Sequence, residues 1–537
     1  MPDAGTFDAV IIGAGHNGLT CAAYLAAAGQ SVCMLERRAV VGGAAVTEEF
    51  HPGFRNSTAS YTVSLLHPKV IRDLRLAHHG LRIVERPLAN FLPLSAQPGD
   101  CLAISNDLAT TQQAVSAFSE RDAESLPAYY AMIERAGEAI RALLMTTPPA
   151  VDGGVMGLLE MWKAARPFRA LDVAGRRDVL ELFTRSAGDV LDRWFESAPI
   201  KAALGFDAVV GQFASPYANG SAYLLLHYAL GEVNGKRGRW GHAIGGMGAI
   251  TQAMARECEA RGVTVRTSVA VNRVIVERGR AAGAALESGE VVRAKRVVAN
   301  VNPKLLFTKL VAADDVPADF STRIEGYRCA SGTFRMNVAL SALPAFAAQP
   351  GDGVHLRSGI VMAPSLGYME QAYFDARSHG WSREPIVEML IPSLVDDSLA
   401  PSGAHVASLF CQHVEPELSR VAPGRSWEDA RDDVAALMID TVTRFAPNFA
   451  DSVIAHRALT PVDLEREFGL VGGDISHGVM SLDQLYSARP VLGHADYRTP
   501  IAGLYMCGAG THPGGGVSGM PGHNAAREIL RDVRRRA

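Results

Sequence analysis

Gly13-Ala14-Gly15-His16-Asn17-Gly18 lies between an apolar run, residues 7–12, and a helix-like stretch, residues 19–26. Glycines at this spacing, between a strand and a helix, are typical of a dinucleotide-binding turn. They permit the tight turn, the close approach of the backbone to the pyrophosphate, and the packing of the helix on its strand. The N–H groups and the positive dipole at the helix start then face the phosphates. We therefore predict that Gly13, Gly15 and Gly18 bind a dinucleotide.

A second apolar run, residues 31–35, ends at Glu36. In dinucleotide-binding folds a carboxylate at the end of the second strand binds the ribose hydroxyls of the adenosine. A negative charge at this point disfavours a 2′-phosphate. Glu36 is therefore the expected ligand of the adenosine ribose.

The residues that follow Glu36 separate two classes of cofactor. Arg37-Arg38 leads to Val41-Gly42-Gly43-Ala44, which resembles the extended FAD motif of the amine oxidase and phytoene desaturase superfamily. In that motif a basic residue and a Gly-Gly pair follow the acid. The resemblance implies FAD as the cofactor and adds Arg37, Gly42 and Gly43 to its binding site.

The end of the chain contains a second glycine-rich segment. A short apolar run, residues 503–507, leads into residues 508–519 and then into a helix expected over residues 521–536. In the FAD enzymes of this superfamily such a segment returns to the cofactor, and its helix directs its N-terminus at the flavin. The resemblance implies that Gly508, Gly519 and Met520 belong to the cofactor site.

Three strings resemble one branch of the phytoene desaturase-related flavoproteins, that of pyridine nucleotide-disulfide oxidoreductase domain-containing protein 2: residues 231–248, 472–478 and 511–519. The likeness runs from Asp8 to the last helix. It implies an α/β fold, with a Rossmann-type FAD-binding domain built from discontinuous segments and an α+β substrate domain. In such relatives the residue at the position of Val269 contacts the adenosine through its backbone. The substrate of this branch is poorly defined.

The order of predicted elements divides the chain into two domains. Strand-like runs and a hairpin at residues 282–292 place the FAD-binding domain at residues 5–75, 236–315 and 490–537. The substrate-binding domain then comprises residues 76–235, which are rich in helix, and residues 316–489, which contain strand-like runs.

The seven cysteines are scattered and contain no C-x-x-C pair. This spacing argues against a disulfide reductase and favours buried thiols in a reducing compartment. No second glycine fingerprint for NAD(P)H follows a strand, so we expect oxygen or a quinone as the electron acceptor.

Composition excludes some classes of partner. A net charge of −4 gives no reason to expect nucleic acid as a partner, and we propose no metal site.

Without a leader or an apolar run of about 18 residues, the protein is expected in the cytoplasm. A basic, partly apolar stretch around Trp162, with Lys163, Arg166, Phe168 and Arg169, suggests peripheral membrane contact or an ordinary buried helix surface. The sequence leaves the oligomeric state open.

Four residues are candidates for catalysis. In the string of residues 472–478, Asp474 or His477 would take a proton while a hydride passes to the flavin, unless the string is a structural turn. His512 lies in the loop expected to face the flavin, where it could also satisfy only backbone groups. Arg335 occupies a strand position where amine oxidases carry a lysine, and a permanently charged guanidinium cannot act as a base. This departure argues against amine oxidation, and Arg335 is either part of the catalytic site or a structural ion-pair partner.

The predicted function is an FAD-dependent oxidoreductase of the desaturase or dehydrogenase type. Its substrate would be hydrophobic, such as an isoprenoid or carotenoid, and FAD would be non-covalent because no attachment motif occurs. Two alternatives remain open: an FAD oxidase of a polar amine or alcohol, and a flavoprotein whose FAD is structural and which acts through protein partners. An acidic or aromatic cage near the flavin would favour the oxidase, and a long apolar tunnel would favour the desaturase.

Overall fold

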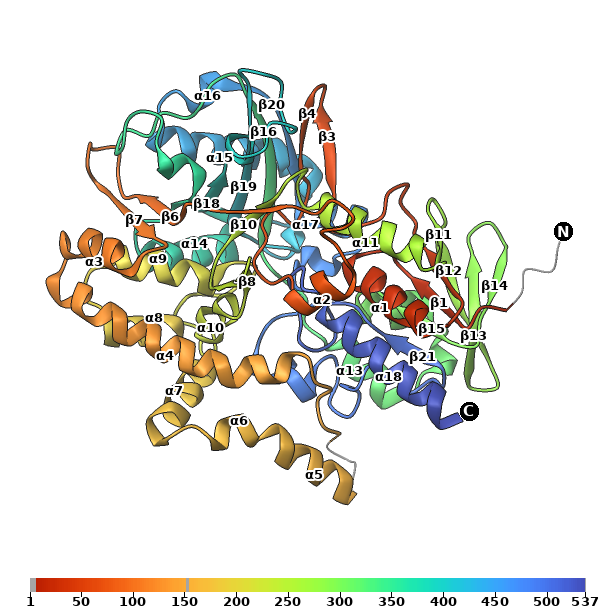
Figure 1. Ribbon diagram of the computed structural model, residues 1–537. Helices are drawn as coiled ribbons and strands as arrows, with labels where there is room; N and C mark the ends of the chain where they lie inside the picture. The colour runs from red at the N-terminus through yellow and green to blue at the C-terminus, as the bar shows by residue number, and fades with distance from the viewer. Residues whose placement is uncertain (1–5, 151–153, 537) are drawn as a thin grey trace.

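A five-stranded parallel sheet forms the first half of the fold. The computed structural model describes residues 6–150 and 154–536 (Figure 1). The sheet draws its strands from the start, the middle and the end of the chain. In the order β11-β2-β1-β15-β21 they are Thr264–Arg266, Val32–Leu35, Ala9–Ile12, Val297–Ala299 and Leu504–Met506. The expected α/β fold with a discontinuous nucleotide-binding domain is confirmed, while the domain boundaries stay predictions.

Both faces of this sheet are covered, as its continuous apolar strands require. One face packs against α1 (His16–Ala27), α11 (Gly248–Ala260) and α18 (Met520–Arg536). The other packs against a three-stranded antiparallel sheet, β12 (Val271–Glu277), β13 (Arg280–Leu286) and β14 (Val291–Arg293). The carboxyl ends of the parallel strands thus open towards the rest of the molecule, where ligands bind in such sheets.

A seven-stranded, mainly antiparallel sheet forms the second half. In the order β20-β16-β19-β18-β17-β6-β7 its strands are Val453–Leu459, Thr333–Leu340, His405–Val414, Trp381–Leu390, Gly359–Met362, Leu88–Pro93 and Cys101–Ser105. The helix-rich first segment therefore also supplies two strands, β6 and β7. Strands such as β6, β17 and β18 alternate their side chains between two cores, as the period of two demands.

Helices cover the two faces of the larger sheet unequally. The layer on one face includes α4 (Glu120–Leu144), α8 (Ala187–Trp194), α9 (Ala198–Val209), α10 (Tyr223–Ala229) and α14 (Leu366–His379). On the other face lies α15 (Trp427–Phe445). Further elements are β3 (Thr47–His51), β4 (Phe54–Ser57), α5 (Gly154–Ala164), α6 (Arg166–Arg169), α7 (Val173–Thr184), β10 (Gly241–Ala243) and α17 (Pro461–Phe468).

The connection after β4, residues 58–66, runs between the two sheets. Arg335 on β16 donates to the Ala59 carbonyl at 3.1 Å, and Asn337 on the same strand donates to the Ser57 carbonyl at 3.1 Å. Val63 exchanges backbone hydrogen bonds with Gly241 at the start of β10. These bonds fix the segment against both halves of the molecule, so its side chains are held in place.

Among residues 6–150 and 154–536, no helix has the length and apolar character needed to cross a membrane.

Candidate active site

The turn between β1 and α1 has the close packing that its glycines predict. Gly13 has a φ of +92°, which disfavours residues with a side chain. A Cβ added to Gly18 would lie 2.4 Å from the Gly13 carbonyl oxygen and 2.8 Å from Nδ2 of Asn300. Asn300 also donates to the Gly13 carbonyl at 3.1 Å. The first turn of α1 therefore lies directly against the glycine turn.

Glu36 lies where the sequence predicts the adenosine to bind. Its carboxylate is buried and accepts the N–H of Ala14 at 2.8 Å and that of Arg38 at 2.9 Å. Arg38 is ion-paired through Nη2 to Glu48 at 2.6 Å, and its guanidinium lies 4.8 Å from the Phe468 ring centre. A carboxylate and an aromatic ring thus face the space beside the glycine turn.

These residues enclose a cavity with an empty volume of about 1110 Å³, which we call the glycine-loop cavity. Its wall includes Gly13, Gly15, Glu36, Arg37, Arg38, Gly43, Val269 and Asn300. Four of the lining residues carry a buried polar atom that has no hydrogen-bond partner within the described ranges: His16 Nε2, Asn17 Oδ1, Arg38 Nη1 and His477 Nδ1. Because buried polar atoms are normally paired, these four indicate a polar ligand. A dinucleotide such as FAD fits this wall.

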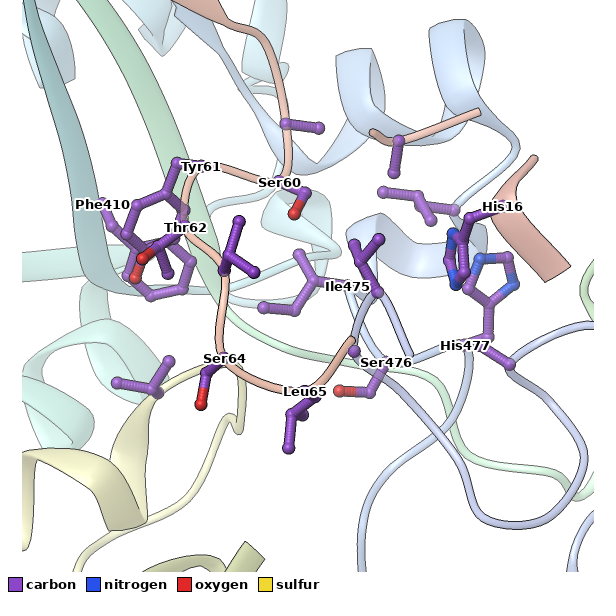
Figure 2. A pocket seen from close by; sticks show the side chains of 18 of the residues that line it. His16, Ser60, Tyr61, Thr62, Ser64, Leu65, Phe410, Ile475, Ser476 and His477 are labelled. Atoms are coloured by element: carbon purple, nitrogen blue, oxygen red, sulfur yellow. The ribbon is translucent and has the colours of Figure 1, made fainter. Parts of the chain in front are cut away.

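A second space, the apolar cavity, lies between the two sheets and has an empty volume of about 1010 Å³. Figure 2 shows the segment of residues 60–65 along it, with Ile475 and Ser476 facing this segment. Apolar side chains dominate the wall: Ala44, Ala59, Val63, Leu65, Val210, Phe410, Leu470, Ile475, Ala509 and Val517. A smaller neighbouring cavity shares Leu65 and His227 with it and is also lined by Leu66, Leu144, Leu230 and Met520.

The two large cavities share a wall formed by His16, Ala44, His477 and Ala509. Figure 2 shows the imidazole rings of His16 and His477 next to one another at one end of the apolar cavity. Burial lowers the pKa of each histidine to about 4, so both rings are neutral at neutral pH. One ring nitrogen of His16 bonds to the Gly516 backbone. A molecule in the apolar cavity therefore contacts a neutral base at the wall of the glycine-loop cavity.

The residues predicted for the cofactor site lie on the wall of the glycine-loop cavity or close to it. Gly13, Gly15, Glu36, Arg37, Gly43 and Val269 line it. Gly18, Gly42, Gly508 and Gly519 lie behind the wall in tight packing, and Met520 lines the smaller cavity beside the apolar one. The N–H of Val269 donates to the Glu36 carbonyl at 2.8 Å, which fixes this backbone at the adenosine end.

The structure separates the four residues predicted for catalysis. His477 alone of the four lines both large cavities. Asp474 is fully buried, and its carboxylate accepts the N–H groups of Ser476 at 2.7 Å and Ala330 at 2.8 Å. Its geometry is that of a turn cap that holds the loop carrying His477.

His512 and Arg335 also lie away from both cavity walls. A ring nitrogen of His512, Nε2, contacts the Leu143 carbonyl at 3.1 Å, and the backbone carbonyl of His512 accepts the Tyr497 hydroxyl. Arg335 is buried in β16 and donates to the carbonyls of Ala59 and Leu409 and to Ser408. Both side chains therefore anchor segments that border the cavities.

Sequence reasoning missed two features of the site. His16 stands inside the glycine motif, and an imidazole in a turn that requires small residues is a signal that could have identified it. Tyr61 and its neighbours in residues 60–65 line the apolar cavity, yet no motif marks them. Their role depends on the packing of β16, β19 and β10, which the sequence alone does not place.

The chain is similar to several known proteins. Residues 18–333 match the family model described as flavin containing amine oxidoreductase. The rat pyridine nucleotide-disulfide oxidoreductase domain-containing protein 2 is 42% identical, over 98% of this chain and 94% of that protein. One of the subunits of limonene dehydrogenase from Castellaniella defragrans is 25% identical, over 99% and 96% respectively. The solved structure of putrescine oxidase bound to putrescine covers 99% of both chains with a TM-score of 0.60 at 16% identity.

Proposed function

Because the chain belongs to the family of flavin-containing amine oxidoreductases, we propose that it dehydrogenates a hydrophobic, isoprenoid-like substrate. The protein is an FAD-dependent oxidoreductase. FAD supplies the hydride acceptor when bound, and the glycine-loop cavity would hold its adenosine and pyrophosphate through Gly13, Gly15 and Glu36.

One observation carries the proposal: the apolar cavity meets the glycine-loop cavity at a shared wall. A substrate there is stripped of water by mainly aliphatic side chains, which favours an apolar molecule. The smaller cavity beside Leu65 adds Leu66, Leu144, Leu230 and Met520, together with the polar side chains of His67, Arg141 and Glu232. The two cavities are the space that we propose for a hydrocarbon chain.

His477 is the residue we propose to take the proton. Forming a carbon–carbon double bond removes a hydride from one carbon and a proton from the neighbouring carbon. His477 is neutral and lines both large cavities, so one of its two ring nitrogens carries a lone pair at the shared wall. Asp474 and Arg489 position it, because Asp474 binds the Ser476 N–H and Arg489 donates to the Ser476 and Gly478 carbonyls. His512 and Arg335 are proposed as supports of the same site.

The limonene dehydrogenase relative has a name that states an apolar terpene substrate, which supports this class of substrate. The second candidate is oxidation of a polar amine or alcohol. It is favoured by the aromatic side chains Tyr61, Phe410 and Trp240 in the apolar cavity. Tyr61 and Phe410 stack on one another with ring centres 5.2 Å apart, whereas a cage requires two rings that face each other across a gap.

We propose peripheral contact with a membrane as the source of the substrate and of a quinone acceptor. In α5, Val155, Leu158 and Trp162 are 82%, 63% and 58% exposed. The Arg169 guanidinium lies 4.4 Å from the Trp162 ring centre. Exposed apolar residues beside cations are typical of a helix that lies on an anionic lipid surface. Figure 1 shows α5 and α6 projecting from the edge of the molecule.

The test is an anaerobic absorbance titration of the purified flavoprotein. One series adds a fractionated lipid extract, and a parallel series adds amines and alcohols. Bleaching of the oxidised flavin band by a lipid fraction supports the proposal and identifies the substrate by fractionation. Bleaching by a polar amine or alcohol alone would replace the proposal with the oxidase. Rapid reduction by any substrate also excludes a purely structural FAD.

A further inference from the structure

The end of the apolar cavity opposite His16 and His477 has a different chemistry. Figure 2 shows Tyr61 and Phe410 at this end, across the cavity from the two histidines. The Tyr61 hydroxyl donates a hydrogen bond to Oε2 of Glu388, which is only 4% exposed on β18. A buried carboxylate thus lies directly behind the aromatic wall of an otherwise apolar space.

Two arginines stand beside this carboxylate. Arg86, 8% exposed, places Nη1 at 3.8 Å from Oε1 of Glu388 and donates through Nη2 to the Thr62 hydroxyl at 2.6 Å. The fully buried Arg335 has its guanidinium 4.5 Å from the Tyr61 ring centre. Arg86 also lies over the ring of Trp240, 5.4 Å from its centre. The aromatic wall is therefore backed by two guanidinium groups.

Behind the aromatic wall, the positive charges of the arginines exceed the negative charges of the carboxylates. Burial, reinforced by the nearby Glu388, raises the pKa of Asp207 on α9 to about 7, so this carboxyl is about half protonated at neutral pH. Glu388 alone cannot neutralise Arg86 and Arg335. The charge nearest to the Tyr61 hydroxyl is nevertheless the Glu388 carboxylate, its hydrogen-bond partner, so an uncharged group is favoured over a carboxylate at this hydroxyl.

The backbone also accommodates this cluster. A Cβ added to Gly359 on β17 would lie 2.8 Å from Oδ1 of Asn90, 2.9 Å from Oε1 of Glu388 and 3.0 Å from Nη1 of Arg86. The strand therefore leaves the space that the buried charges occupy. Buried charge clusters often stabilise a fold less than apolar side chains of the same size would, so a role in binding explains this one better than stability does.

Building on the proposed function, we infer that the Tyr61 end of the apolar cavity binds a hydroxyl group of the substrate. The Tyr61 hydroxyl donates its hydrogen to Glu388. Its oxygen then accepts a hydrogen bond from the substrate hydroxyl. The bound group fixes how far the hydrocarbon chain extends towards His477, and this distance selects the carbon that is oxidised.

The experiment uses the FAD-loaded enzyme and follows the shift of its flavin absorbance on ligand binding. The probes are decane, decanol, decanoate and decylamine, which share a chain and differ in the terminal group. We expect decanol to bind at least tenfold more tightly than decane, and more tightly than decanoate and decylamine, because an apolar cavity penalises a buried charge.

Two variants make the test specific. Tyr61→Phe keeps the ring stacked on Phe410 and removes the hydroxyl, so the preference for decanol over decane should fall about tenfold, the effect of one buried hydrogen bond. The matched control is Tyr217→Phe, because the Tyr217 hydroxyl also binds a carboxylate, Asp192 at 3.0 Å, and Tyr217 lies outside the apolar-cavity lining. The control should keep the decanol preference of the unmodified enzyme.

Equal binding of decane and decanol, tighter binding of decylamine, or an unchanged preference in Tyr61→Phe would each overturn the inference. In all three outcomes ten-carbon probes still bind, and the proposed apolar substrate class stands. If none of the probes shifts the flavin band while polar amines reduce it, the inference and the proposed function fail together. A melting curve for each variant shows that any loss of preference occurs in a folded protein.

Discussion

The glycine-loop cavity and the apolar cavity share His16 and His477 but differ in how clearly the sequence marks them. The first contains two segments that stand in recognisable motifs, around Gly13 and Glu36, together with more distant residues such as 269–271 and 467–469. The second combines residues 59–65 with Val210, Trp240, Phe410 and Ile475, and no motif marks the segment of residues 59–65. Cofactor recognition is thus visible in the sequence, whereas the wall that would contact the substrate is not. Substitutions at the glycine turn should therefore impair FAD binding, whereas substitutions at the wall between the cavities should impair turnover.

The largest effect is expected at the glycine turn. Gly18→Ala places a methyl group 2.4 Å from the Gly13 carbonyl oxygen, so α1 must move away from the pyrophosphate site. We expect FAD affinity to fall at least 100-fold, measured as the flavin content of the purified protein and by titration with FAD. Gly367→Ala is the control, because its added Cβ meets only the Ser365 hydroxyl, at 3.8 Å. Retention of full flavin content by Gly18→Ala would contradict the proposed role of the glycine turn in cofactor binding.

The wall between the cavities should control turnover and leave the cofactor bound. His477 has a φ of +56°, and asparagine tolerates this left-handed conformation. His477→Asn should therefore keep the backbone and slow flavin reduction about 100-fold, the usual contribution of a general base. His512→Asn should slow it less than fivefold. The measurement is the anaerobic reduction rate with the substrate found in the lipid titration, and the reverse ranking would move the base to His512.

The first of these predictions concerns the glycine turn, which the sequence alone identifies. The second concerns His477, whose role the sequence alone does not separate from that of Asp474. The strand, the glycine turn and Glu36 were predictable because a dinucleotide imposes its geometry on a short continuous string. His477 could be placed among the candidates because glycines surround it, yet Asp474 in the same string was indistinguishable from it. Only the structure shows that Asp474 accepts backbone N–H groups while His477 lines the cavities.

The Tyr61 end was beyond reach of sequence reasoning for a physical reason. Tyr61, Arg86, Arg335 and Glu388 come from segments far apart in the chain, and none stands in a recognisable motif. Each is an ordinary residue until β16, β19 and β18 pair in the seven-stranded sheet and bring Arg335 and Glu388 close to Tyr61. Arg335 was noticed through a resemblance, whereas in the structure it anchors residue 59 and lies over the Tyr61 ring.

A change at Asp474 should affect stability more than binding. Asp474→Ala removes the acceptor for the buried N–H groups of Ser476 and Ala330, and unpaired buried donors are costly. We expect a loss of about 2–3 kcal/mol in unfolding free energy by denaturant titration. Asp319→Ala, which breaks only an exposed ion pair with Arg323, should change it by less than about 0.5 kcal/mol. If Asp474→Ala unfolded like the unmodified protein but lost turnover, a direct catalytic role would follow.

A smaller effect is expected on the surface, far from both cavities. Trp162→Ala should leave unfolding free energy within about 0.5 kcal/mol, because the side chain is 58% exposed. Co-sedimentation with anionic vesicles should fall about tenfold if α5 lies on the lipid. Phe374→Ala is the control, since Phe374 is 51% exposed on α14. Equal losses for both variants would show that vesicle binding is not confined to α5.

The smallest effect separates the two ends of the apolar cavity by pH. Burial lowers the pKa of His477 to about 4, so this base stays deprotonated and flavin reduction should change less than twofold between pH 6 and 8. Asp207, with its pKa raised to about 7 by burial and Glu388, loses its proton over the same interval. That added negative charge faces the Glu388, Arg86 and Arg335 cluster, so decanoate should bind about threefold more weakly at pH 8 than at pH 6. Decanol, which carries no charge, should bind equally at both. If flavin reduction instead tracked a group near pH 6.5, a histidine of ordinary pKa would be the base, and the buried wall between the cavities would not be the site of proton transfer.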